Sequence, residues 1–146
     1  MGCLDSLDGL ARSGRVPGIA ALAARKAGLQ FIFSLQDGSI RPMMPAASRA
    51  AAFDRMAEMC VSSKRPGLVA DVVVLGQACE LEERLERAND SNRLTIGRLF
   101  VGTFGSAITL CTGPDVAGLA WRWRWPGDGA DVTGGSGRVD DPATLR

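Results

Sequence analysis

Residues 93–125 hold the densest strand-forming sequence in the chain and constrain its fold more than any other segment. Two apolar runs, Leu94–Val101 and Ala107–Cys111, are separated by glycines at positions 102 and 105. The segment ends in the alternating run Trp121–Trp125 (WRWRW), which contains all 3 tryptophans of the protein. β-Branched and aromatic residues with turn-forming glycines between them are typical of paired strands. We therefore predict that residues 93–125 form the sheet on which the helices pack.

The rest of the chain predicts further strands and helices. Leu29–Leu35 alternates apolar and polar residues as a half-buried strand does, and Asp37-Gly38 is a hairpin turn signal. The apolar run Leu68–Leu75 fits either a buried strand or the start of a longer helix, because periodicity does not separate the two in a short run. We take it as a strand. The other expected elements are a helix beginning at Pro17, a return strand Ser39–Arg41, helices Ala46–Val61 and Gln77–Ala88, and a last strand Ala120–Trp125.

These elements together predict an α+β fold in a single small domain. We expect a mostly antiparallel sheet of about five or six strands packed by two or three helices, since 146 residues is the size of one domain. The expected organisation is a flexible N-terminal segment 1–13, the α+β domain 14–125, and a disordered Gly/Asp-rich tail 126–146. In outline, residues 29–120 resemble roadblock-type or other profilin-like adaptor domains, which implies a protein that acts by binding.

Composition argues against several functional classes. The net charge of +1 shows no strong overall bias toward nucleic acid or anionic lipid. The chain has 0 histidines, which removes the commonest general base and the commonest metal ligand, and it has no recognisable catalytic motif. Its 4 cysteines form no CxxC pair, so we predict free thiols in a reducing compartment. We expect a non-enzymatic protein with no catalytic residues, no cofactor and no metal.

The N-terminus carries a candidate lipidation site. Met1-Gly2-Cys3-Leu4-Asp5-Ser6 matches the pattern for myristoylation of Gly2, with Cys3 as a candidate for palmitoylation. These residues resemble the N-termini of dually acylated proteins such as G-protein alpha subunits and Src-type kinases. One myristoyl chain binds membranes only marginally, so a stable anchor requires a second signal, here on Cys3. The alternative is a chance match, which a bacterial source would favour.

The alternating run at the end of the sheet segment is the second candidate site. On a strand, Trp121, Trp123 and Trp125 would share one face, and Arg122 and Arg124 the other. Indole rings stack on bases and arginines bind phosphate, so the run could bind single-stranded nucleic acid. A lipid interface would suit the same alternation. The third interpretation is structural, with the tryptophans covering the core and the arginines in solvent.

We therefore predict a binding or adaptor module, tethered to the cytosolic face of a membrane by Gly2 and Cys3 if the source is eukaryotic or viral, and otherwise cytoplasmic. The alternative is a nucleic-acid binder that uses Trp121–Trp125. The sequence does not identify a protein partner, and an exposed sheet edge near Trp125 would also favour a homo-oligomer.

Overall fold

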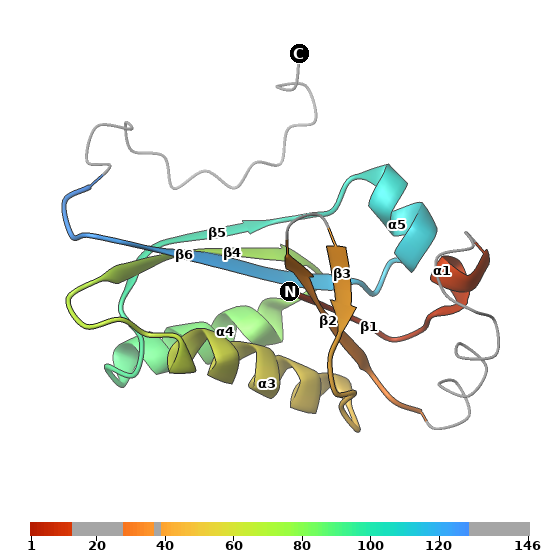
Figure 1. The fold of residues 1–146 in the computed structure, drawn as a ribbon, viewed down its shortest axis with the longest axis horizontal. Coiled ribbons are helices and arrows are strands. Elements are labelled where there is room, and N and C mark those ends of the chain that lie inside the picture. Colours follow the sequence, from red (N-terminus) through yellow and green to blue (C-terminus); the bar gives the residue numbers. More distant parts are fainter. Residues whose placement is uncertain (13–27, 37–38, 129–146) are drawn as a thin grey trace, which may run out of the picture.

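A computed structural model describes residues 1–12, 28–36 and 39–128. Within them a single sheet carries two long helices on one face and two short helices at one end (Figure 1). The strands are β1 (Gly2–Leu4), β2 (Phe31–Gln36), β3 (Ser39–Pro42), β4 (Val69–Gly76), β5 (Ile96–Gly102) and β6 (Ala117–Arg124). The helices are α1 (Asp8–Arg12), α3 (Arg49–Ser62), α4 (Cys79–Asp90) and α5 (Ser106–Thr112). The predicted α+β class with a single small domain is confirmed.

The sheet has six strands in the order β3-β2-β1-β6-β4-β5. Every neighbouring pair is antiparallel except β4 and β5, which are parallel and joined through α4. A parallel pair needs a crossover connection, and the helix between Gly76 and Ile96 provides it. The ambiguous run Leu68–Leu75 is a strand, β4, as we predicted.

The main core lies between the sheet and the long helices. On α3, the buried residues Phe53, Met56 and Cys60 recur at helical spacing, and Leu81, Leu85 and Ala88 do so on α4. Both stripes pack against the sheet residues Cys3, Ile32, Ala70, Val72, Val74, Ala117 and Leu119. Helix α3 begins where the sequence provides a cap, because Ser48 Oγ accepts a hydrogen bond from the Ala51 amide at 3.1 Å.

Two expectations are corrected by the structure. Ala107–Cys111 lies in α5 and is not a strand. Leu94–Val101 therefore does not form a hairpin with Ala107–Cys111, and β5 pairs with β4. The N-terminal residues expected to be flexible include β1, which pairs with β2 on one side and β6 on the other. A strand of three residues is too short to show a period, and its partners are distant in sequence.

Other predictions fall wholly or partly outside the described residues. The helix expected from Pro17 and the turn at Asp37-Gly38 lie outside them, although Gln36 and Ser39 on either side of that turn are paired. The tail predicted for residues 126–146 is described only as far as Asp128.

Candidate functional site

The sheet has a second face, which α3 and α4 do not cover, and we call it the open face. Successive residues of a strand point to opposite faces. On β4, Val72 and Val74 are buried beneath the helices, so Val73 and Leu75 belong to the open face. In the strand register Val73 lies beside Ala120 of β6 and Phe100 of β5. This row is apolar and largely accessible, with Phe100 49% exposed.

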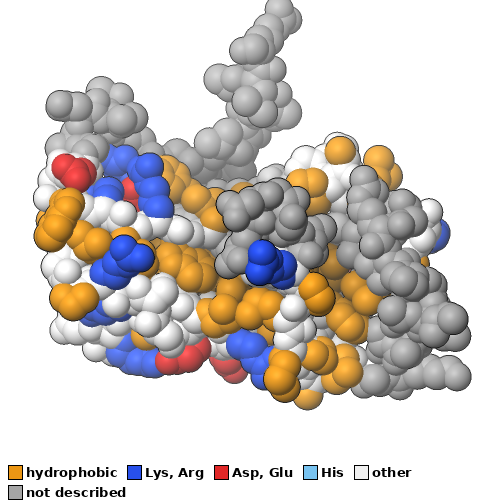
Figure 2. Space-filling view, in the orientation of Figure 1, with side chains coloured by type: hydrophobic (Ala, Val, Ile, Leu, Met, Phe, Trp, Pro, Cys, Tyr) orange, Lys and Arg blue, Asp and Glu red, His pale blue; other side chains and the backbone are white. Residues whose placement is uncertain are grey.

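Apolar side chains are also prominent on the face of the molecule drawn in Figure 2. Figure 2 shows them gathered in a band across the described part of the molecule, with Arg and Lys side chains beside it. Among the described residues, the large apolar side chains that are exposed are Leu35, Met44, Phe100, Val101, Ile108, Leu110 and Trp125. Phe100 and Val101 are neighbours on β5, whereas the other exposed apolar residues lie outside this strand.

At one end, aromatic rings cover the open face. A small second core contains Leu4 and Val116 with four partly buried residues packed on it, among them Phe33 and Phe104. A Cβ atom added to Gly2 would lie 2.6 Å from Phe33 Cζ, and one added to Gly118 would lie 2.7 Å from Phe104 Cζ. The two rings therefore pack directly on backbone, and Gly2 and Gly118 are neighbours in the sheet.

The other end of the open face is charged. Asp71 of β4 is 5% exposed, and its carboxylate accepts hydrogen bonds from Arg124 Nε at 2.8 Å and from Arg122 Nη2 at 3.0 Å. Burial by itself would raise the pKa of Asp71, but the hydrogen bonds and positive charges of Arg124 and Arg122 outweigh it and hold the pKa below its ordinary value. The Arg124 side chain is 17% exposed and that of Arg122 is 74% exposed.

This arrangement has the chemistry of a site for an amphipathic anion. The two arginines and Asp71 leave a net positive charge beside the apolar row. Arg122 is accessible enough to bind a further carboxylate, since a guanidinium carries five N–H donors. The apolar row lies between Arg122 and the aromatic end, because Ala120 is two residues from Arg122 and two residues from Gly118 on β6.

The predicted tryptophan platform is divided between different surroundings. Trp121 and Trp123 are partly buried and pack against the core on the helix side of the sheet, and Trp121 Nε1 donates a hydrogen bond to Ser63 Oγ at 2.9 Å. Trp125 lies beyond the end of β6 and is 63% exposed. Arg122 and Arg124 extend from the opposite face, as the alternation predicts. Two of the three indoles are therefore engaged in packing, and binding of nucleic acid stays a prediction.

The candidate lipidation residues lie within the sheet. Gly2 is buried beside Phe33, and Cys3 is fully buried in the main core. Burial raises the pKa of the Cys3 thiol to about 11, which disfavours the reactive thiolate. An acyl chain on Cys3 would require β1 to leave the sheet, because that side chain is fully buried. Acylation itself stays a prediction.

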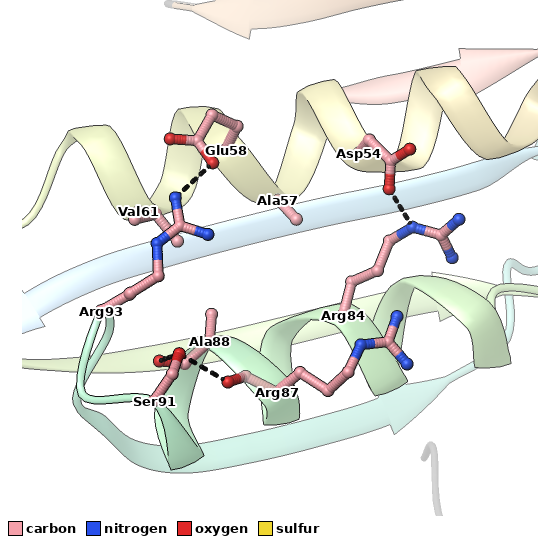
Figure 3. A pocket seen from close by; sticks show the side chains of 9 residues that line it. All are labelled: Asp54, Ala57, Glu58, Val61, Arg84, Arg87, Ala88, Ser91 and Arg93. Atoms are coloured by element: carbon pink, nitrogen blue, oxygen red, sulfur yellow. Dashed lines mark hydrogen bonds and ion pairs between the residues drawn. The ribbon is translucent and has the colours of Figure 1, made fainter.

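A groove of about 400 Å³ lies between α3 and α4, away from the sheet (Figure 3). Ion pairs join its two walls, Asp54 to Arg84 and Glu58 to Arg93. The same pairing satisfies most of the charges that line the groove. We therefore interpret it as the seam between two packed helices.

The described residues also bear on metal sites and on membrane-spanning helices. Among the described residues, no group of three His, Cys, Asp or Glu side chains is placed to hold a metal ion. None of the helices that the structure describes has the length and apolar character needed to cross a bilayer.

Sequence reasoning missed Asp71 and Phe104, which define the two ends of the open face. A signal for Asp71 was present, because it is an acidic residue inside the apolar strand Val69–Gly76 and buried carboxylates need partners. For Phe104 we find no such signal, since its contact with Gly118 depends on the fold.

Comparison with known proteins gives one family. Residues 3–123 match a family described as "Uncharacterised protein, DegV family", which supersedes the outline resemblance to roadblock-type domains. A search of curated proteins gives no match.

Similar folds occur in several solved structures. A DegV family protein from Eubacterium eligens, loaded with heptadecanoic acid, is 16% identical with a TM-score of 0.62, over 81% of this chain and 42% of that chain. A fatty acid binding DegV family protein from Streptococcus agalactiae is 18% identical with a TM-score of 0.63, over 82% and 42%. A Thermotoga maritima protein, described as revealing fatty acid binding function, is 16% identical with a TM-score of 0.62, over 82% and 40%. The chain therefore spans less than half the length of these structures, and at such identities the likeness establishes the fold alone.

Proposed function

The chain belongs to the DegV family, and from this premise we propose that it is a non-enzymatic binding protein whose ligand is a long-chain fatty acid. Structures of similar fold from Eubacterium eligens and Streptococcus agalactiae are described with a fatty acid or as binding one. Because this chain corresponds to less than half of each, the ligand is inferred for this chain from the chemistry of its own open face.

The observation that carries the proposal is an apolar row that lies next to an accessible arginine. A fatty acid needs apolar surface for its alkyl chain and a cation for its carboxylate. Val73, Ala120 and Phe100 provide the first, and Arg122 the second. Asp71 holds Arg122 in place through two hydrogen bonds, at 3.0 and 3.2 Å, so the guanidinium is oriented before a ligand arrives.

In the proposed complex the carboxylate binds Arg122 and the alkyl chain follows the strands toward Phe104. The ends of this path, positions 122 and 118 of β6, are about 14 Å apart at the rise of an extended strand. Each buried methylene contributes about 0.8 kcal/mol, or about fourfold in affinity. Affinity should therefore rise steeply with chain length until the alkyl chain reaches the aromatic end.

The test is a calorimetric titration of the delipidated protein with hexadecanoic acid and with its methyl ester. Arg122→Met removes the cation but keeps an apolar side chain of similar length. We expect it to weaken binding of the acid about tenfold, the value of one hydrogen-bonded charge pair, and to leave binding of the ester unchanged. Arg87→Met is the matched control, because Arg87 is similarly exposed but lies on α4. Equal binding of the acid by the Arg122→Met variant and the unaltered protein would refute the proposed carboxylate site.

Acylation of the N-terminus and binding of nucleic acid, both predicted from the sequence, are proposals with separate tests. Acylation at Gly2 and Cys3 predicts an added acyl mass on the intact protein from eukaryotic cells. Gly2→Ala is a poor control for it, since the new Cβ would meet Phe33, so an inhibitor of N-myristoylation is the better comparison. Nucleic-acid binding through Trp125 and Arg122 is favoured by their exposure alone and predicts binding to single strands that weakens steeply with salt.

A further inference from the structure

The described sheet has two edge strands, and they differ in how well they are protected. Edge strands present unpaired N–H and C=O groups, and monomeric proteins usually protect them with short length, charge or proline. Strand β3 has all three, since it is four residues long and ends in the exposed pair Arg41 and Pro42. Strand β5 has seven residues, no proline, and Arg98 as its only charged residue.

The exposed side chains of β5 are apolar on both sides of the sheet. Phe100 is 49% exposed and Val101 is 44% exposed, and neighbouring residues of a strand point to opposite faces. A single exposed apolar side chain is ordinary, but two in succession on an unpaired edge expose apolar surface above and below the sheet. This pattern is typical of a strand that pairs with another strand.

We propose that β5 pairs antiparallel with β5 of a second copy of this chain, about a two-fold axis at Leu99. A two-fold axis brings the same surface of both copies together, so the edge must complement itself. With Leu99 at the axis, Arg98 of each copy lies opposite Phe100 of the other. Arg98 and Phe100 are both on the open face, because their partners on β4 are Asp71 and Val73.

In each of the two cross-strand pairs, Arg98 of one copy faces Phe100 of the other, and these side chains are chemically complementary. A guanidinium stacks on an aromatic ring through its planar face, which is attractive by electrostatics and dispersion. Arg98 has a further interaction within its own chain, and stacking leaves its N–H groups available for that interaction. By symmetry the contact occurs twice, which favours this register over one displaced by two residues.

Dimerisation would also extend the open face. The row of Ala120, Val73 and Phe100 would continue into Arg98 of the second copy. A seven-residue edge buries less surface than the 1,200–2,000 Å² typical of stable complexes, so roughly micromolar or weaker association is expected.

Sedimentation velocity of the full chain from about 1 µM to about 500 µM tests the proposal. The unaltered protein should pass from monomer to dimer within this range. Phe100→Lys places a lysine opposite Arg98 twice and should weaken association at least about tenfold, since like charges on facing strands repel. Phe100→Glu places a carboxylate there and should retain the dimer.

The comparison of these two variants distinguishes pairing in the proposed register from non-specific hydrophobic association. Met44→Lys is the control, because Met44 is an exposed apolar residue that follows β3, the edge strand opposite β5, and it should leave association unchanged. A protein that stays monomeric throughout, or equal loss of the dimer with lysine and glutamate at position 100, would overturn the proposal.

Discussion

Replacing Asp71 by asparagine should destabilise the protein by about 3 kcal/mol at pH 7. The carboxylate is 5% exposed and accepts three hydrogen bonds from two guanidinium groups. Losing the charge leaves Arg124, 17% exposed, without its counter-charge, and breaking such a buried pair costs about 3–5 kcal/mol. We take the lower limit because Arg122 is 74% exposed, and exposed pairs contribute roughly 0–1 kcal/mol.

The effect should depend on pH in a direction that follows from the pKa of Asp71. Its pKa in the folded protein is below the ordinary value of 3.8. The carboxylate therefore contributes its full stability above pH 3.8, and the contribution is lost as the pH falls through the lower, folded-state pKa. The difference between the unaltered protein and Asp71→Asn should shrink below that pKa.

Urea unfolding followed by tryptophan fluorescence measures the destabilisation and its pH dependence, because Trp121 and Trp123 are partly buried next to β4. Asp128→Asn is the matched control, since the Asp128 side chain is exposed and the substitution keeps its backbone carbonyl, which accepts a hydrogen bond from Arg124. A cost below about 1 kcal/mol for Asp71→Asn would place this pair with ordinary surface ion pairs and refute the reasoning. So would a cost that is unchanged when the carboxylate is protonated.

Two further predictions follow from other contacts. Burial raises the thiol pKa values of Cys3 and Cys60 to about 11 and about 12, whereas Cys79 is exposed. A maleimide at pH 7.5 should therefore label Cys79 within minutes, and Cys3 and Cys60 only after unfolding. Peptide mass spectrometry would show which cysteines are labelled. Arg49 donates hydrogen bonds to Asp5 and to two backbone carbonyls of loops distant in sequence. Arg49→Met should therefore lower the free energy of unfolding in urea by about 2 kcal/mol. A change near zero would contradict a role for Arg49 in holding these loops together.

Local patterns were sufficient for most of the elements. The apolar stripe within Ala46–Val61 predicted α3, and the turn residues Asp37-Gly38 predicted the hairpin of β2 and β3. These signals are local, because helical periodicity and hairpin turns depend on residues close together in the chain.

The prediction for Ala107–Cys111 was wrong because a short apolar run fits either element. Ile108 and Thr109 favour a strand by propensity, but the segment does not pair with β5, whose neighbour in the sheet is β4. The segment forms α5 instead, with Ile108 46% and Leu110 80% exposed.

By itself the sequence determined the α+β class, the positions of the long helices and the alternation that separates Trp121 and Trp123 from Arg122 and Arg124. Only the tertiary structure decided that Gly2 pairs with Gly118, that Asp71 meets both arginines, and that the open face joins a charged end to an aromatic one. The physical reason is distance along the chain. Periodicity reports which side of an element is buried, whereas a site assembled from strands far apart in sequence depends on strand order and register.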